Sequence, residues 1–156
     1  MKPLFASAIL VLLSLLPVEG KTRCMFRVHA EANAQDTEVF SSAIRAKVSG
    51  KQVAIQKVAS ITEQDVVGFS AYQAGDGNFG ALIQLDDHGR ITLDSLSMEH
   101  RGGYLFIFMN GRAITELQID KRVSDGKIYI ASGLTAADLQ LMKKAWRLIG
   151  PKKSRP

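Results

Sequence analysis

The fold is decided by residues 104–111, which read Tyr104-Leu105-Phe106-Ile107-Phe108-Met109-Asn110-Gly111. Six consecutive apolar residues are typical of a strand that is covered on both faces or lies at the centre of a sheet. Asn-Gly is the preferred pair for a two-residue type I′ turn, because both residues adopt a positive φ there. The stretch therefore predicts a central strand that turns directly into an antiparallel partner over residues 112–120.

Other strand patterns lie on both sides of this hairpin. Residues 26–32 alternate apolar and polar side chains, which is the period of a half-buried strand. Ser49-Gly50 is flanked by two apolar runs and predicts a second hairpin. Further strands are predicted wherever an apolar run is bounded by turn signals, at residues 44–48, 53–58, 81–85 and 127–131.

Two capping boxes predict the helices, because a Thr hydroxyl and an Asp three residues later can each bond the other's backbone amide. Thr62-Glu63-Gln64-Asp65 predicts a short helix to about Phe69, with Val66, Val67 and Phe69 buried. Thr135-Ala136-Ala137-Asp138 predicts a longer helix that ends at Gly150-Pro151. Between the two boxes, Asp86-Asp87-His88-Gly89 is predicted to be a turn.

These elements predict an α+β fold, in which an antiparallel β-sheet carries two helices packed on one face as a two-layer sandwich. Residues 21–150 are expected to form a single domain, because the chain after residue 20 has room for one apolar core.

The N-terminal residues predict export from the cytoplasm. Lys2 is followed by an apolar run from Leu4 to Leu16, a helix-breaking Pro17 and short residues up to Gly20. This arrangement is typical of a cleaved signal peptide over residues 1–20. We expect cleavage near Gly20 and a periplasmic or secreted mature chain that begins at Lys21.

The net charge is +5, and three of the positive charges lie in the last six residues. The remainder is close to neutral, which argues against a nucleic-acid-binding protein. The basic tail, residues 151–156, either touches anionic lipid or an acidic partner at the membrane surface or is simply a solvated end. The sole cysteine, Cys24, excludes an intramolecular disulfide and is interpreted as a thiol near a frayed terminus.

The sequence predicts no metal site and no cofactor. His29 and Glu31 could face the same side of a strand, and His88 follows Asp86 and Asp87, but no ligand spacing typical of a metal site joins the histidines. An alternative hypothesis is a periplasmic hydrolase or small-ligand-binding enzyme that uses Asp86, Asp87 and His88. The main expectation is that the protein is not an enzyme, because no nucleophile motif is present.

From residue 61 to about 150 the order of signals resembles a known family. It consists of the Thr62 box, Ala81-Leu82-Ile83-Gln84-Leu85 before Asp86-Asp87-His88-Gly89, the Asn110-Gly111 hairpin, and Asp125-Gly126 before the Thr135 box. This order resembles the head subdomain of the first periplasmic region of SecD and SecDF, an accessory subunit of the protein-export translocase. The resemblance implies a binding module without catalytic residues.

The chain departs from that family in two respects. The family carries a proline after the Asn/Asp-Gly turn, whereas Ile114-Thr115-Glu116-Leu117 has none. The family's transmembrane helices are also missing from this sequence, which predicts a freestanding secreted relative of the head rather than a proton-driven motor.

The resulting prediction is a secreted or periplasmic, non-enzymatic binding module that contacts polypeptide or an envelope protein such as a translocase component. Two glycine-containing segments are its candidate binding surface. Arg101-Gly102-Gly103 precedes the buried strand and would let a partner approach the backbone closely, although a sharp structural loop is the alternative. Asn110-Gly111-Arg112 follows the same strand. The oligomeric state is left open.

Overall fold

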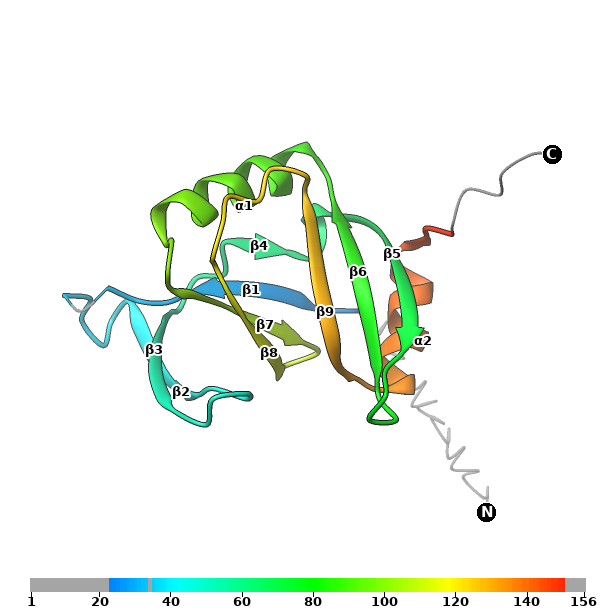
Figure 1. Cartoon of the computed structure of the whole chain (residues 1–156), viewed down its shortest axis with the longest axis horizontal. Coiled ribbons are helices and arrows are strands. Elements are labelled where there is room, and N and C mark those ends of the chain that lie inside the picture. The colour runs from blue at the N-terminus through cyan, green and yellow to red at the C-terminus, as the bar shows by residue number, and fades with distance from the viewer. Residues whose placement is uncertain (1–22, 34, 151–156) are drawn as a thin grey trace, which may run out of the picture.

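The computed structural model describes residues 23–33 and 35–150, so the predicted signal peptide and basic tail lie outside the described residues. Within these ranges the fold is α+β, as predicted, and nearly all strand pairs are antiparallel. The strands divide between two four-stranded sheets and a separate hairpin (Figure 1).

The first sheet has the order β4-β1-β7-β8. Its strands are β1 (Phe26–Ala30), β4 (Ile61–Thr62), β7 (Tyr104–Met109) and β8 (Arg112–Gln118). The predicted central strand is confirmed, because β7 lies between β1 and β8 and is buried at four of its six positions. The predicted turn is also confirmed, since Asn110 has φ 50° and Gly111 has φ 80°.

The second sheet has the order β10-β5-β6-β9. Its strands are β5 (Val66–Gln73), β6 (Phe79–Leu85), β9 (Lys127–Leu134) and β10 (Arg147–Leu148). β10 is parallel to β5, and Gly68 allows this pairing because a Cβ at that position would lie 2.8 Å from the carbonyl oxygen of Arg147.

One apolar core joins both sheets. It contains fully buried residues from the first sheet, such as Phe26 and Ile107, and from the second, such as Ile83 and Ile130. The helices α1 (Asp87–Glu99) and α2 (Ala136–Ala145) add Leu93, Leu96, Leu139 and Met142 to it. Figure 1 shows α1 across one end of the sheets and α2 on the side of β5. Neither helix is long and apolar enough to cross a bilayer.

Three predicted elements differ from the structure. The Thr62 capping box is present, but it closes only a 3₁₀ turn, η1 (Glu63–Asp65), and the chain then continues as β5 instead of a helix to Phe69. Val66 and Phe69 are buried as predicted, whereas Val67 is exposed. The β-branched pair Val66-Val67 favours a strand here, and Val66 pairs with Leu85.

The predicted turn at Asp86-Asp87-His88-Gly89 is instead the beginning of α1. Asp86 is the N-cap and accepts a hydrogen bond from the amide of Gly89. Glycine is more typical of a turn than of a helix, so Gly89 favoured the wrong prediction. A glycine is required here because a Cβ would lie 2.9 Å from Cβ of Asp65 and 3.0 Å from Cβ of Leu85.

The second helix has the predicted Thr135–Asp138 box but ends earlier than Gly150. Trp146 is already extended, and Arg147 and Leu148 form β10. The ring of Trp146 packs edge-on against Phe26 and Phe69, so it joins the core from outside the helix.

The hairpin of β2 (Ser41–Arg45) and β3 (Gln52–Gln56) lies beside the first sheet (Figure 1). One antiparallel bridge connects it to the end of β1, namely Glu31 with Ile55, and this bridge contains the hydrogen bond from the Ala32 amide to the Ala54 carbonyl. Its inner side contributes Ala46 and Ile55 to a small apolar cluster with Phe106 of β7. A hollow remains between the hairpin and the sheet.

A candidate binding groove beneath the hairpin

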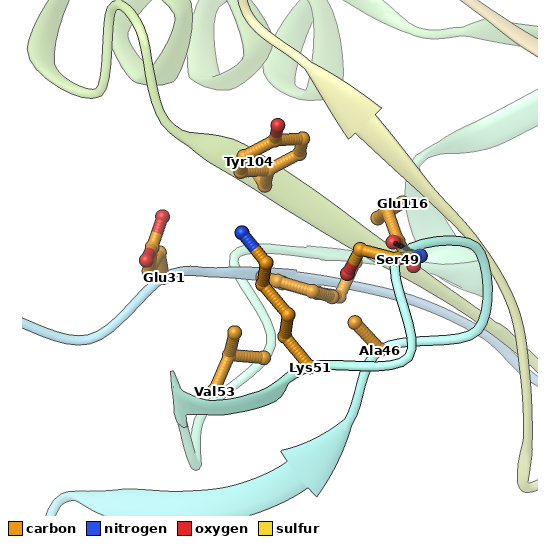
Figure 2. A pocket seen from close by; sticks show the side chains of 8 residues that line it. Glu31, Ala46, Ser49, Lys51, Val53, Tyr104 and Glu116 are labelled. Atoms are coloured by element: carbon orange, nitrogen blue, oxygen red, sulfur yellow. Dashed lines mark hydrogen bonds between the residues drawn. The ribbon is translucent and has the colours of Figure 1, made fainter.

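The hollow between the β2–β3 hairpin and the first sheet has a volume of about 230 Å³. Its floor is apolar and is formed by Ala46, Val53 and the buried ring of Phe106. Its rim carries polar groups of both signs, Glu31, Lys51 and the hydroxyl of Tyr104 (Figure 2). In Figure 2 the ammonium group of Lys51 reaches across the opening toward Glu31 and Tyr104.

Glu116 holds the hairpin over this hollow. Its carboxylate accepts hydrogen bonds from the amides of Val48 (3.0 Å) and Ser49 (2.6 Å) in the hairpin turn. Burial works against ionisation of this side chain, but the hydrogen bonds from Val48 and Ser49 outweigh it and lower the pKa of Glu116. Glu116 pairs with Phe106 across β7 and β8, so one cross-strand pair supplies both the floor and the anchor.

A second hollow of about 280 Å³ adjoins the first and shares Glu31 with it. It is lined by Ala32, Asn33, His100, Arg101 and Gly103. Gly103 allows Glu31 to lie close to the backbone, because a Cβ there would be 3.3 Å from the Glu31 carboxylate. We call the two hollows together the Glu31 groove.

The structure separates the predicted surface residues into two groups at opposite ends of β7. Arg101 and Gly103 line the Glu31 groove. Their neighbour Gly102 has φ 87° and donates its amide to Ile119, while Gly103 accepts from the Ile119 amide, so this backbone is already paired with its own chain. The loop therefore offers side chains rather than a free strand edge.

The other predicted group fastens α2 to the β7–β8 turn. The side-chain amide of Asn110 donates to Asp138 at 2.9 Å, and the guanidinium of Arg112 forms an ion pair with the same carboxylate. Burial opposes ionisation of Asp138, but hydrogen bonds from Thr135 and Asn110 and the charge of Arg112 outweigh it and lower its pKa. A role of Asn110, Gly111 and Arg112 in binding stays a prediction.

The three residues of the alternative enzyme hypothesis, Asp86, Asp87 and His88, each contact a different group. Asp86 caps α1, and Asp87 is exposed beside Arg90. His88 instead contacts Asp65, whose carboxylate lies 2.7 Å from its Nδ1 atom. Asp65 was predicted only as a cap residue, because nothing in the sequence brings residue 65 next to residue 88. Its hydrogen bond and charge raise the pKa of His88.

Possible ligand atoms of Asp65, Asp86 and His88 lie within 4.8 Å of one another. Their other contacts account for this proximity, since Asp65 also accepts from the Thr62 amide and Asp86 from the Gly89 amide. The remaining histidines lie elsewhere. His29 contacts the Gln56 carbonyl at 2.8 Å, and His100 lines the Glu31 groove.

Cys24 differs from the thiol near a frayed terminus that was expected. It is buried in the core, and its sulfur lies 3.7 Å from Sδ of Met109. Burial raises the pKa of Cys24 to about 12, so the thiol is a poor nucleophile in the folded protein.

Comparison with known structures shows which class of fold this is. No protein-family model matches the chain, and no curated protein matches its sequence. The fold is nevertheless similar to that of SecDF, in agreement with the resemblance seen in the motif order.

Two solved structures carry this similarity. One comes from work on SecDF as a membrane component that enhances protein export, with a TM-score of 0.55 and 14% sequence identity over 80% of this chain. The other is SecDF in its super-membrane-facing form, with a TM-score of 0.55 and 13% identity over 80% of this chain. The present chain spans 63% and 19% of those chains, respectively.

Proposed function

We propose that this protein is a non-enzymatic, periplasmic or secreted binding module that holds extended polypeptide in the Glu31 groove, in the manner of an export accessory domain. The observation that carries the proposal is the groove itself, an apolar floor with a rim of both charges, on a fold similar to SecDF. The predicted signal peptide supports the location.

The chemistry of the groove suits a polypeptide without a fixed sequence. An extended chain presents unpaired amide donors and carbonyl acceptors along its length. The rim supplies acceptors at Glu31 and donors at Lys51 and Arg101, while Phe106 and Val53 bury apolar side chains. Tyrosine is among the residues that most often carry a large share of binding free energy. Tyr104 stands over the opening between the two hollows' shared residue Glu31 and the apolar floor (Figure 2), so it is the first residue to test.

The test uses the chain from Lys21 onward and a fluorescein-labelled polypeptide kept unfolded by carboxymethylation of its cysteines. Fluorescence anisotropy gives the dissociation constant. We expect Tyr104→Ala and Lys51→Ala each to weaken binding by about tenfold. The matched control is Tyr129→Ala, which removes an exposed tyrosine from β9. Equal affinities of the Tyr104 and Tyr129 variants would overturn the proposal.

A further variant distinguishes groove binding from addition of a strand to the sheet. β2 is the outer strand of the hairpin, and hydrogen bonds from Ala46 to Lys51 and from Lys57 to Phe40 place the Ala43 amide on the side away from β3. Ala43→Pro therefore leaves the hairpin intact and blocks strand addition at this edge. Binding is expected to survive Ala43→Pro, and its loss would assign the site to the edge of β2.

The enzyme hypothesis makes a separate prediction. With Nδ1 held by the buried Asp65 carboxylate, Nε2 of His88 would be the group that accepts a proton. If any hydrolytic turnover is detected, its loss in His88→Gln would support the alternative, and unchanged turnover would end it.

A further inference from the structure

The β2–β3 hairpin has a charge unlike that of the rest of the protein. Residues 41–57 contain four basic residues, Arg45, Lys47, Lys51 and Lys57, and no acidic residue. The other described residues contain 11 basic and 14 acidic side chains. The hairpin is therefore a cationic segment on an otherwise slightly acidic body.

The four cations of the hairpin are exposed, although Lys51 reaches over the Glu31 groove (Figure 2) and Nζ of Lys57 donates a hydrogen bond to the Glu38 carbonyl. None of the four lies within ion-pair distance of a carboxylate among residues 23–33 and 35–150. In contrast, Arg27, Arg112 and Arg122 each hold a carboxylate of the body. A cation that is not paired with a carboxylate keeps its attraction for an external anion.

Residues 39–58, which contain the hairpin, also carry the four most exposed large apolar side chains of the described chain. Val58 is 80% exposed, Val48 72%, Val39 69% and Phe40 68%. The hydrogen bond from the Lys57 amide to the Phe40 carbonyl places the backbone of Val39, Phe40 and Val58 at the open end of the hairpin, whereas Val48 lies in its turn. Exposed apolar side chains gathered in this way mark an interaction surface.

The outward face of the hairpin carries short or unbranched side chains, so it can lie against a flat partner. Ile44, Val53 and Ile55 turn inward to the cluster around Phe106, so alternation places Ala43, Gln52 and Ala54 on the outer face. All three outer residues are exposed. Figure 1 shows β2 and β3 at one side of the molecule, away from both helices.

We propose that residues 39–58 bind the surface of an anionic phospholipid bilayer. Arg45, Lys47 and Lys57 contact the phosphates of the headgroups, and Phe40, Val39 and Val58 enter the boundary with the acyl chains. A bilayer is favoured over an acidic protein or a nucleic acid because it alone presents a flat sheet of anions above an apolar interior. The surface is separate from the Glu31 groove, which the inner side of the hairpin lines.

The test measures sedimentation of the chain from Lys21 with lipid vesicles. We expect binding to vesicles of equal parts phosphatidylglycerol and phosphatidylcholine, weakening with salt, and none to pure phosphatidylcholine. The triple variant Arg45→Gln, Lys47→Gln, Lys57→Gln should bind roughly a hundredfold more weakly, from about fivefold per cation. Lys51 is left unchanged because it lines the groove.

Three controls make the proposal falsifiable. Replacing three exposed lysines of the body, Lys121, Lys127 and Lys143, by Gln should have a much smaller effect, and an equal loss would overturn the proposal. Replacing Lys152, Lys153 and Arg155 by Gln should preserve binding, and complete loss would assign it to the basic tail.

The third control separates lipid from any other polyanion. Val39→Ser, Phe40→Ser and Val58→Ser together should weaken vesicle binding at least tenfold while leaving binding to heparin unchanged. Vesicle binding that is unaffected by these substitutions would show a purely electrostatic surface and end the lipid proposal. Circular dichroism establishes that each variant is folded.

Discussion

Tyr72 of β5 reaches over Gly80 of β6 to β9, where its hydroxyl lies 2.8 Å from the carbonyl oxygen of Ile130 and 3.0 Å from that of Ala131. The ring of Tyr129 stacks on the ring of Tyr72, with centroids 5.8 Å apart. One tyrosine thus joins three strands of the second sheet. It can do so only because the residue of β6 beneath its ring, Gly80, has no side chain.

Gly80→Ala is expected to destabilise the protein by about 3 kcal/mol. A Cβ at this position would lie 2.3 Å from the Tyr72 ring and 2.5 Å from the Ala131 carbonyl oxygen, and the backbone oxygen cannot move aside cheaply. Urea unfolding measures the effect. Gly75→Ala is the control, because a Cβ there meets no atom within 4 Å, and a similar loss in both variants would contradict the explanation.

Asp138→Ala is expected to destabilise the protein by about 3 kcal/mol, since it leaves Arg112 and Asn110 without their buried acceptor and removes the carboxylate that accepts from the amide of the N-cap residue Thr135. Thr135→Ala removes the cap alone and should cost about 1 kcal/mol. Asp87→Ala breaks an exposed pair with Arg90 and should cost less than about 0.5 kcal/mol. Thermal unfolding would contradict this order if Asp87→Ala were the most damaging.

The contact between His88 and Asp65 predicts a pH dependence of stability. Because the pKa of His88 is raised in the folded state, its contribution is complete below the ordinary histidine value of about 6.5 and is lost as the pH rises through the folded pKa. The difference in unfolding free energy between the natural chain and His88→Gln should therefore shrink as the pH rises from that value. A difference that stays constant over this range would contradict the contact between His88 and Asp65.

Glu116→Ala is expected to loosen the hairpin and to cost about 1 kcal/mol, because the Val48 and Ser49 amides lose a charged acceptor. Hydrogen exchange should accelerate in peptides covering residues 41–57 and stay unchanged in β9. The lowered pKa of Glu116 means that its contribution is present above the ordinary carboxylate pKa and disappears as the pH falls through the folded value. Uniform acceleration across the protein would contradict a local anchor.

The sequence was sufficient wherever a few neighbouring residues determine the structure. The Asn110-Gly111 turn and the Thr135–Asp138 box depend on local backbone geometry and are present as predicted. The Thr62 box forms too, but distant pairing of Val66 with Leu85 ends its helix after one turn. Gly89 led to a wrong prediction of a turn. A glycine is needed there because Asp65 packs against it, and Asp65 is 24 residues away in the sequence.

The groove could not be predicted for the same reason. Its residues come from the end of β1, the hairpin, the loop before β7 and both strands β7 and β8. Arg101 and Gly103 were identified by their position before a buried strand. No residue near Glu31 or Lys51 in the sequence indicates that they line a groove. Only the fold brings these side chains together.

The strand order β4-β1-β7-β8 also governs when the protein can fold. β1 pairs Phe26 with Met109 and Ala30 with Leu105, so the two residues of these pairs lie 83 and 75 positions apart in the sequence. Contacts of such long sequence separation form slowly. If the chain crosses a membrane N-terminus first, as the predicted signal peptide implies, the first sheet can close only after residues 104–109 have crossed.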